Sequence, residues 1–251
     1  MSDLFCLRGD ALANLAVSRD QHGEWECGCS GKFRARCDDA EFPTRFANRA
    51  LGDLDWDCIE PPDARTTLQE YCANIAAYLD ESIGLILSGP VGCGKTHLAI
   101  GAAKLACAFG YTALFVNAPT WFQELRESYG TSNSTVEQER MEQMRTADVL
   151  ILDDLGAEKP SDWARERLYI VINHRALARR VTFATTNRAL EELEHVVGER
   201  VMSRLYGDAL ALALVGSDYR QVEREHRLRC IRDTARGVRE LSAEKDRACK
   251  P

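Results

Sequence analysis

The chain has 251 residues, a formal net charge of −7 and a sequence pI of about 5.4, and its length suits one α/β domain with an appendage or two small domains. This acidic balance gives no global positive field, so any contact with nucleic acid must come from a local patch. No apolar run approaches the roughly 20 residues that span a bilayer, and the N-terminal MSDLFCLRGD lacks a signal-peptide pattern, so we expect a cytoplasmic protein with no membrane partner.

Residues 1–60 contain clustered cysteines and little periodicity, and we expect them to form a small appendage that binds a partner protein. The stretch WECGCSGKFRARC resembles a zinc knuckle, although zinc sites usually pair cysteines as C-x₂₋₄-C and this stretch has a C-x-C pair. A zinc site, a degenerate remnant of one and plain reduced thiols all stay open. A zinc site would use Cys6, Cys27, Cys29 and Cys37, with His22 as a further ligand.

A break at PPDA (61–64) marks the start of a second region, in which strand and helix patterns alternate. Five short apolar runs separated by helical patterns predict a five-stranded parallel sheet covered by helices on both faces. The runs are 83–88, 112–117, 149–154, 181–187 and 211–216. We expect this α/β domain to cover residues 61–221 and a charged helical tail to cover residues 222–251.

The stretch GPVGCGKTH follows the first of these strands and fits the pattern G-x-x-x-x-G-K-[ST]. Its glycines let backbone N–H groups turn toward phosphates, and the helical run after it would direct its N-terminus at the same anion. The lysine would reach the β- and γ-phosphates of a nucleotide, and the threonine hydroxyl would bind Mg²⁺. We predict an ATP site made by this P-loop: Gly89, Pro90, Val91, Gly92, Cys93, Gly94, Lys95, Thr96 and His97.

The run VLILDD, residues 149–154, is an apolar strand that ends in two carboxylates. With a P-loop upstream, Asp153 is predicted to hold Mg²⁺ together with Thr96. Asp154 is then placed to orient or polarise the attacking water. One carboxylate for the metal and one for the water is the minimal set for phosphoryl transfer, which needs mainly positioning and charge neutralisation.

The run VTFATTN, residues 181–187, ends another predicted strand in hydroxyls and an amide. Ligands of open α/β sheets bind outside the carboxyl ends of the strands. Asn187 is therefore expected near the γ-phosphate and its attacking water, and its amide can hydrogen-bond both.

The motifs GPVGCGKTH, LILDDLG, ATTN, GERVMSRL and GSDYR occur in an order that resembles the AAA+ ATPases, most of all the DnaC-type replicative helicase loaders and their IstB-like transposition relatives. The resemblance covers about residues 42–221 and includes RFANRALGDLDW, residues 45–56. It implies that Asn187 is sensor 1, that Arg204 is an arginine finger inserted into a neighbouring subunit's site, and that Arg220 is the sensor-2 arginine.

Two features qualify what the resemblance implies. Arg200 stands one helical turn before Arg204 and is the alternative finger, or it makes a structural ion pair. The family often has Asp-Glu where this chain has Asp153-Asp154, and the shorter second side chain predicts slow or partner-dependent hydrolysis.

The leading hypothesis for function is an ATP-dependent helicase loader that oligomerises with ATP, binds a hexameric replicative helicase through residues 1 to about 60, and contacts single-stranded DNA. The loop ESYGTSNST, residues 127–135, is one candidate for the DNA contact, and an inert connection is the other reading. The alternative is an IstB-like transposition helper ATPase, which would bind duplex DNA and recruit a transposase. A small-molecule kinase and a GTPase fit less well, since paired trans and cis arginines are unnecessary in the first and no N-K-x-D motif supports the second.

Overall fold

The structure is a computed structural model that describes residues 18–19, 25–26, 30–47, 49–128 and 134–216, and the single positions 218, 219, 224, 228 and 229. The chain divides into two units, residues 1–216 and 217–251. Every element named below belongs to the first unit. Nearly all of the predicted tail at 222–251 lies outside the described residues.

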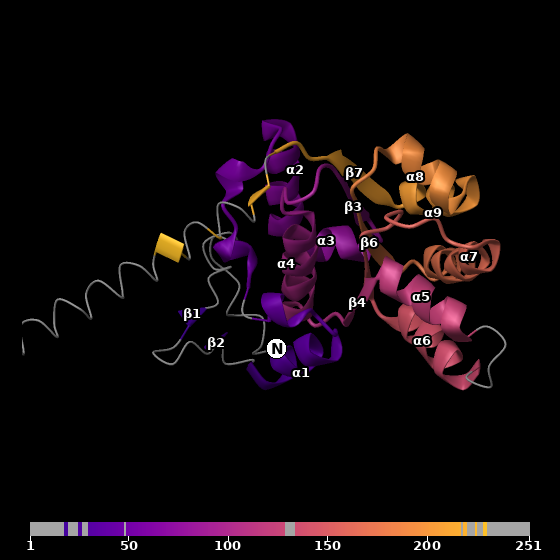
Figure 1. Cartoon of the computed structure of the whole chain (residues 1–251). Helices are drawn as coiled ribbons and strands as arrows, with labels where there is room; N and C mark the ends of the chain where they lie inside the picture. The colour runs from indigo at the N-terminus through magenta and orange to yellow at the C-terminus, as the bar shows by residue number, and fades with distance from the viewer. Residues whose placement is uncertain are drawn as a thin grey trace, which may run out of the picture. The chain divides into compact units, whose positions relative to one another are not determined.

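Five parallel strands form the central sheet, as the apolar runs predict (Figure 1). The P-loop strand β3 pairs on one side with β6 and on the other with β7, and β6 also pairs with β5, so the order is β4-β5-β6-β3-β7. The strand β6 therefore separates the P-loop strand from the strand that ends in Asp153. The bounds are β3 Gly84–Ser88, β4 Ala113–Asn117, β5 Val149–Asp153, β6 Val181–Thr186 and β7 Ala209–Ala213.

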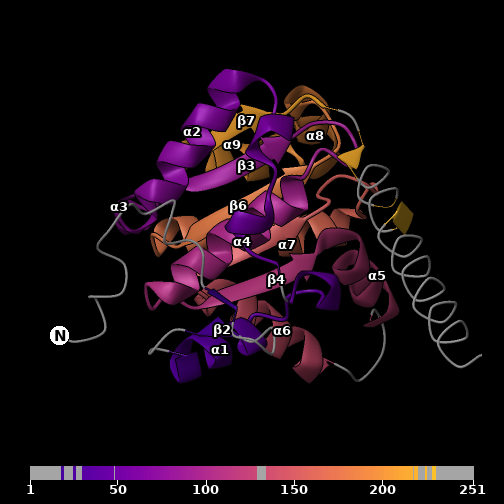
Figure 2. The ribbon, with the colours of Figure 1, turned by 90° about the vertical axis from the view of Figure 1, so that its left-hand side faces the viewer.

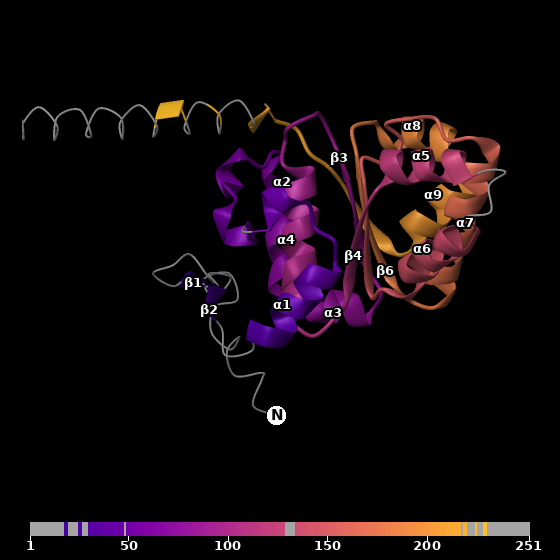
Figure 3. The same ribbon diagram turned by 60° about the horizontal axis from the view of Figure 1, so that its bottom comes forward.

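Helices cover both faces of the sheet, because the strand side chains alternate between two apolar layers (Figure 3). Leu85 and Leu87 of β3 pack with the helices on one face, whereas Ile86 packs on the other. The first layer contains α1 Ser30–Asp39, α2 Pro62–Ala73, α3 Ile75–Asp80 and α4 Lys95–Ala108. The second contains α5 Ala118–Ser128, α6 Ser134–Thr146, α7 Asp162–Leu177, α8 Leu190–Val197 and α9 Glu199–Gly207.

The helix α4 is covered on its outer side as well as on the sheet side (Figure 2). The outer cover is α1 and residues 40–60, which we call the N-terminal linker; it contains short 3₁₀ turns at Thr44–Phe46, Leu51–Asp53 and Trp56–Cys58. Ala40 also accepts a hydrogen bond of 2.8 Å from the backbone N–H of Phe115 on β4. Residues 30–60 thus pack against the sheet-bearing unit, while the partner-binding role predicted for residues 1–60 stays a prediction. Before α1, the two-residue strands β1 Ser18–Arg19 and β2 Trp25–Glu26 pair antiparallel.

The end of the first unit runs back past the P-loop. The backbone N–H of Leu214 donates to the carbonyl of Ser88, and that of Val215 donates to the carbonyl of Glu60, each at 2.7 Å. A Cβ at Gly89 would lie 2.3 Å from the carbonyl oxygen of Leu214, so the first P-loop position accepts only glycine. In the part of the chain that the structure describes, no helix combines the length and the apolar character needed to cross a bilayer.

Candidate nucleotide-binding site

The P-loop joins β3 to α4 and wraps around its own lysine. Gly92 and Gly94 have φ of 85° and 94°, in the left-handed region that glycine enters freely. The Lys95 side chain is buried, and its Nζ donates to the carbonyl oxygens of Gly89 at 2.8 Å and Pro90 at 2.6 Å. No side chain caps the start of α4, so its first-turn N–H groups suit an anion.

The carboxylate of Asp153 lies directly against Thr96 at the carboxyl edge of the sheet. The Thr96 hydroxyl donates to Asp153 Oδ1 at 2.7 Å, and the Thr185 hydroxyl donates to the same oxygen at 2.8 Å. Burial raises the pKa of Asp153, and the two hydroxyl hydrogen bonds oppose that rise. A threonine hydroxyl beside one carboxylate, next to a phosphate-binding loop, is a donor set that fits Mg²⁺, which takes few protein ligands and completes its shell with phosphates and water. Thr96 and Asp153 are therefore the residues that would hold the metal.

Asp154 and Asn187 lie together beside this pair. The Asn187 amide Nδ2 donates to Asp154 Oδ1 at 3.1 Å. Asp154 has φ of 55°, an uncommon conformation for a residue with a Cβ, and its backbone N–H donates to the Thr185 hydroxyl at 3.0 Å. The structure thus brings together Thr96, Asp153, Asp154 and Asn187, which the sequence places on α4 and at the ends of two strands.

The side chain of His97 turns away from the loop toward the N-terminal linker. Its Nε2 lies 3.1 Å from the carbonyl oxygen of Ala50, and its ring centroid lies 5.7 Å from that of Phe46. Because a carbonyl only accepts hydrogen bonds, Nε2 carries a proton. Burial lowers the pKa of His97. His97, which the sequence predicts as part of the nucleotide site, therefore contacts the linker through its side chain.

The predicted arginines have different positions. Arg204 and Arg200 are both exposed on α9, a helix that packs on α7 and α8, and neither pairs with another residue in the described ranges. Arg220 lies outside the described residues. The roles of Arg204 as a trans finger and Arg220 as sensor 2 stay predictions.

Sequence reasoning missed two residues near Asp153. Thr185 is fully buried and contacts both acidic residues, and the only sequence signal for it is a hydroxyl near a strand end. Arg45 of the linker lies near enough for its positive charge to lower the pKa of Asp153, against the rise due to burial. Its guanidinium carbon lies 4.6 Å from the centroid of the Phe46 ring, the ring that also approaches His97.

The zinc prediction falls mostly on residues beyond this description. Cys6, Cys27 and Cys29, like His22, lie outside the described residues. Cys37 is described as a free thiol on α1, where a hydrogen bond with Cys107 of α4 lowers its pKa. Among the residues with described positions, no three His, Cys, Asp or Glu side chains gather as a metal site would require.

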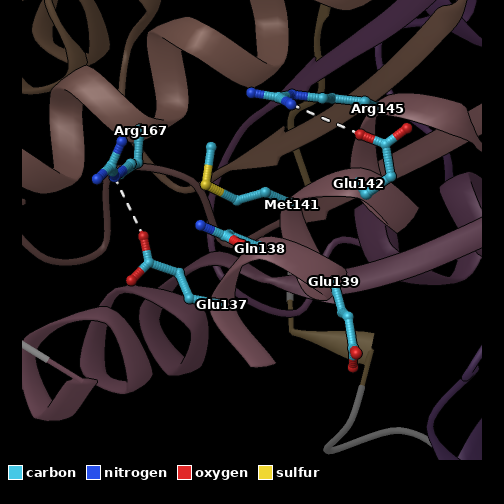
Figure 4. Close-up of a pocket in the computed structure, with 7 residues that line it drawn as sticks. All are labelled: Glu137, Gln138, Glu139, Met141, Glu142, Arg145 and Arg167. Atoms are coloured by element: carbon cyan, nitrogen blue, oxygen red, sulfur yellow. Dashed lines mark ion pairs between the residues drawn. The ribbon is translucent and has the colours of Figure 1, made fainter. Parts of the chain in front are cut away.

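A separate hollow of about 630 Å³ lies on α6 and α7, and Figure 4 shows its lining. Its lining contains two ion pairs, one between α7 and α6, Arg167 with Glu137 at 3.1 Å, and one within α6, Arg145 with Glu142 at 3.5 Å. None of its lining residues belongs to the P-loop or to a strand end. The residues predicted for the nucleotide site therefore lie outside this hollow.

Comparisons with known proteins show which family the chain resembles. The family model of the IstB-like ATP binding proteins matches residues 30–227. The replicative helicase loader DnaC of Escherichia coli K12 is 27% identical over 158 residues, which are 62% of this chain and 61% of the relative. The ATP-binding protein of insertion sequence IS1162 from Pseudomonas fluorescens is 33% identical over 137 residues, 54% of this chain and 56% of the relative. The chain therefore spans less than two thirds of the length of both relatives.

Among solved structures, a crystal structure of DnaI superposes with a TM-score of 0.60 at 27% identity and covers 69% of this chain and 95% of the other. This likeness and the parallel five-stranded sheet confirm the predicted AAA+ P-loop fold. Because the family model matches most of the chain, the protein belongs to the IstB-like ATP-binding protein family.

Proposed function

We propose that the chain hydrolyses ATP at the P-loop and acts as a helicase loader. The observation behind the first part is the cluster in which Thr96 bonds Asp153 while Asn187 bonds Asp154, at 2.7 Å and 3.1 Å. Lys95 would leave its two carbonyl acceptors and neutralise the β- and γ-phosphates. Thr96 and Asp153 would hold Mg²⁺, whose positive charge would offset the negative charge that develops on the phosphates.

Asp154 and Asn187 would act on the attacking water. The carboxylate of Asp154 would accept a hydrogen bond from the water and direct its oxygen at the γ-phosphorus, and Asn187 would hold both Asp154 and a γ-phosphate oxygen. The bond from the water oxygen to phosphorus forms as the bond to the β-phosphate oxygen breaks, giving ADP and phosphate. The shorter reach of Asp154, compared with a glutamate, is the basis for proposing slow or partner-stimulated turnover.

The two remaining arginines would make hydrolysis depend on assembly. Arg204 is exposed on α9 without an ion-pair partner among described residues, which suits a side chain that enters a neighbouring protomer's site. A guanidinium at the γ-phosphate stabilises the transition-state charge and leaves when the protomers part. We propose Arg220 as the matching cation from the same chain.

The loader part of the proposal is supported by relatives that are named replicative helicase loaders, DnaC of Escherichia coli K12 and DnaI of Bacillus subtilis. We propose that residues 1 to about 60 bind a hexameric replicative helicase, and that the assembled ATP-bound oligomer contacts single-stranded DNA. The linker supports a route from that partner to the nucleotide, because it packs directly on the P-loop helix through His97 and Ala50.

A transposition helper is the second candidate, because the matching family model is that of the IstB-like proteins and the IS1162 relative has a higher identity than DnaC. It would use the same catalytic residues, bind duplex DNA and recruit a transposase. Duplex binding without sequence reading depends on phosphate neutralisation, and the net charge of −7 favours the loader.

A pull-down of the full chain with ATP present, using the host's replicative helicase and transposase candidates as separate prey, tests the proposal. The loader predicts retention of the helicase, and Lys95→Ala should reduce it if ATP drives assembly. Retention of a transposase with no helicase would overturn the loader in favour of the transposition helper. Phosphate release measured on the same sample, with and without the retained partner, tests the ATPase separately.

A further inference from the structure

The hydroxyl of Thr185 joins the two acidic residues of the site. Thr185 lies one residue before the end of β6 and is fully buried. Its hydroxyl donates to Asp153 Oδ1 at 2.8 Å and accepts from the backbone N–H of Asp154 at 3.0 Å. A hydroxyl has one proton and two lone pairs, so it fills both roles at once. The Thr185 hydroxyl oxygen is thus hydrogen-bonded to the carboxylate of Asp153, at the proposed metal site, and to the backbone N–H of Asp154, at the proposed water site.

The hydrogen bond from Thr185 ties the Asp153 carboxylate to β6, in addition to the bond from the P-loop helix. Thr96 of α4 and Thr185 of β6 both donate to Oδ1, and two donors on one oxygen restrict rotation of the carboxylate. If Thr96 rearranges when it takes up Mg²⁺, the Thr185 bond is the one that still holds Asp153. The geometry of the metal site therefore depends on a residue that is not itself a metal ligand.

The bond to Asp154 supports an unusual turn. Asp154 has φ of 55°, and a non-glycine residue in a sparsely populated region costs on the order of 1 kcal/mol or more unless its surroundings hold it there. Thr185 holds this turn twice, since its hydroxyl accepts from Asp154 N–H and its carbonyl accepts from Leu155 N–H at 2.8 Å. The turn is what directs the Asp154 carboxylate to Asn187.

We propose that Thr185 is a positioning residue for ATP hydrolysis: its hydroxyl sets the Asp153 carboxylate and the Asp154 turn together, and so couples the metal position to the water position. This inference rests on the ATPase activity proposed above and deepens it. Thr185 is a positioning residue and not a catalytic one, because its hydroxyl acts through Asp153 and Asp154.

The test compares Thr185→Val, which removes the hydroxyl at nearly constant shape, with Thr185→Ser, which keeps it. Thr182→Val is the matched control, because it removes a hydroxyl from the same strand, where Thr182 accepts from Arg175 Nε at 3.1 Å. The first readout needs neither nucleotide nor metal: hydrogen exchange of the peptide containing residues 153–157 in the full-length protein. We expect at least tenfold faster exchange at the Asp154 amide in Thr185→Val, near-normal exchange in Thr185→Ser, and no change there in Thr182→Val.

The second readout is the effect of Mg²⁺ on the binding of a fluorescent ATP analogue. Losing a hydrogen bond to a buried carboxylate changes an equilibrium constant by roughly tenfold or more. Thr185→Val should therefore bind the analogue with normal affinity in EDTA. The increase in affinity that Mg²⁺ causes should be about tenfold smaller than in wild type. Where turnover is measurable, kcat should fall by at least the same factor while KM changes little, and Thr185→Ser should restore it.

Normal exchange and normal Mg²⁺ tightening in Thr185→Val would overturn the proposal, as would equal effects from Thr182→Val. If Thr185→Val does not fold, Thr185→Ala replaces it in both readouts. Absence of turnover in the wild type, with its partner present, would instead remove the proposed ATPase, and the exchange and binding readouts would still decide the role of Thr185.

Discussion

The ammonium group of Lys104 on α4 donates a hydrogen bond of 2.8 Å to the carbonyl oxygen of Arg49 in the N-terminal linker. The same group donates to the carbonyls of Phe46 and Ala47, so all three of its N–H donors are used. Lys104 is buried, and that burial lowers its pKa. The P-loop helix and the linker are therefore joined by a cation enclosed in backbone carbonyls.

Lys104→Met tests this junction. The variant keeps most of the apolar stem but removes the Lys104 donor from three carbonyls, of which that of Phe46 keeps a hydrogen bond from the Arg49 N–H. We therefore expect a loss of about 3 kcal/mol in the free energy of unfolding. Urea unfolding measures it, and hydrogen exchange should speed up at residues 46–50. Lys159→Met, at an exposed position, is the control and should change stability by less than about 0.5 kcal/mol. Equal midpoints for the two variants would contradict a structural role for Lys104.

Gly101→Ala tests the contact between α4 and Leu51. Alanine normally stabilises a helix interior relative to glycine by up to about 1 kcal/mol. Here the added Cβ would lie 2.7 Å from Cγ and Cδ2 of Leu51, which is buried and has little room to move. We expect a net loss of about 1–3 kcal/mol, typical of overpacking.

The controls for this prediction separate the clash from helix propensity. Gly207→Ala adds a Cβ with nothing within 4 Å and should be neutral or slightly stabilising. In the Leu51→Ala background the clash is absent, so Gly101→Ala should no longer lower the stability. A double-mutant cycle measured by thermal unfolding gives this coupling between the two positions. Additive losses would show that the effect of Gly101→Ala does not arise from the clash with Leu51.

The sheet and the P-loop could be predicted from the sequence because their signals are local. Each strand contains a short apolar run, as in VLIL of β5, and Gly94 of the P-loop directly precedes Lys95 and Thr96. The same is true of Asp153, whose position at the end of a strand follows from where the apolar run stops. These features need no knowledge of which segments meet in space.

The outer cover of α4 could not be predicted, because its signals lie in pairs of distant residues. In the sequence, Lys104 looks like a surface charge, and its role shows only when the carbonyls of Phe46 and Arg49 are placed beside it. Gly101 looks like a weak helix former until Leu51 is placed against it. Thr185 likewise shows its role only when Asp153, 32 residues earlier, lies within hydrogen-bond distance. The proposed reach of Arg204 into a second protomer depends on a chain that the sequence does not place.

Arg175→Met tests a second buried cation, this time between α7 and the end of α6. Arg175 is fully buried, and its Nη1 donates to the carbonyls of Met144 and Ala147, each at 2.7 Å. These carbonyls lie at the C-terminal end of α6, where the helix itself supplies no donors to them. We therefore expect a loss of about 3 kcal/mol or more in the free energy of unfolding. Chemical unfolding measures it. The control is Arg179→Met, because the Arg179 side chain is 70% exposed and its loss should change stability little. A similar loss of stability in both variants would show that the buried hydrogen bonds of Arg175 do not stabilise the fold.

Asp154→Asn tests the carboxylate that we propose to orient the attacking water. Asparagine has the same size, tolerates the left-handed backbone at this position and retains the Oδ1 that accepts from Asn187. The charge is lost and Oδ2, an acceptor, becomes an NH₂ donor. ATP should therefore bind within about twofold of wild type while turnover falls about 100-fold or more. Phosphate release and analogue binding measure the two effects, and Lys95→Ala is the contrasting variant that should lose binding itself. Turnover near the wild-type level would assign the water to another residue.

Arg204→Ala tests whether the proposed finger acts across a protomer boundary. Alone, this variant should bind ATP and fail to hydrolyse it, and Lys95→Ala alone should fail to bind. Mixed in equal amounts, the two should regain activity, because an intact Lys95 site can then meet an intact Arg204 from its neighbour. Random pairing would complete about a quarter of the sites, and Lys95→Ala protomers, which lack ATP, pair no better than that. The mixture should therefore regain activity up to about a quarter of wild-type turnover.

The outcome of mixing distinguishes the alternatives for the finger. A finger acting within its own chain would leave the mixture inactive, since no subunit then holds both groups. If Arg200 is the finger, Arg204→Ala alone hydrolyses ATP normally, and Arg200→Ala becomes the variant that Lys95→Ala complements. Both arginines lie exposed on α9, so neither substitution should disturb the core, and equal unfolding midpoints for the two variants make the comparison one of function.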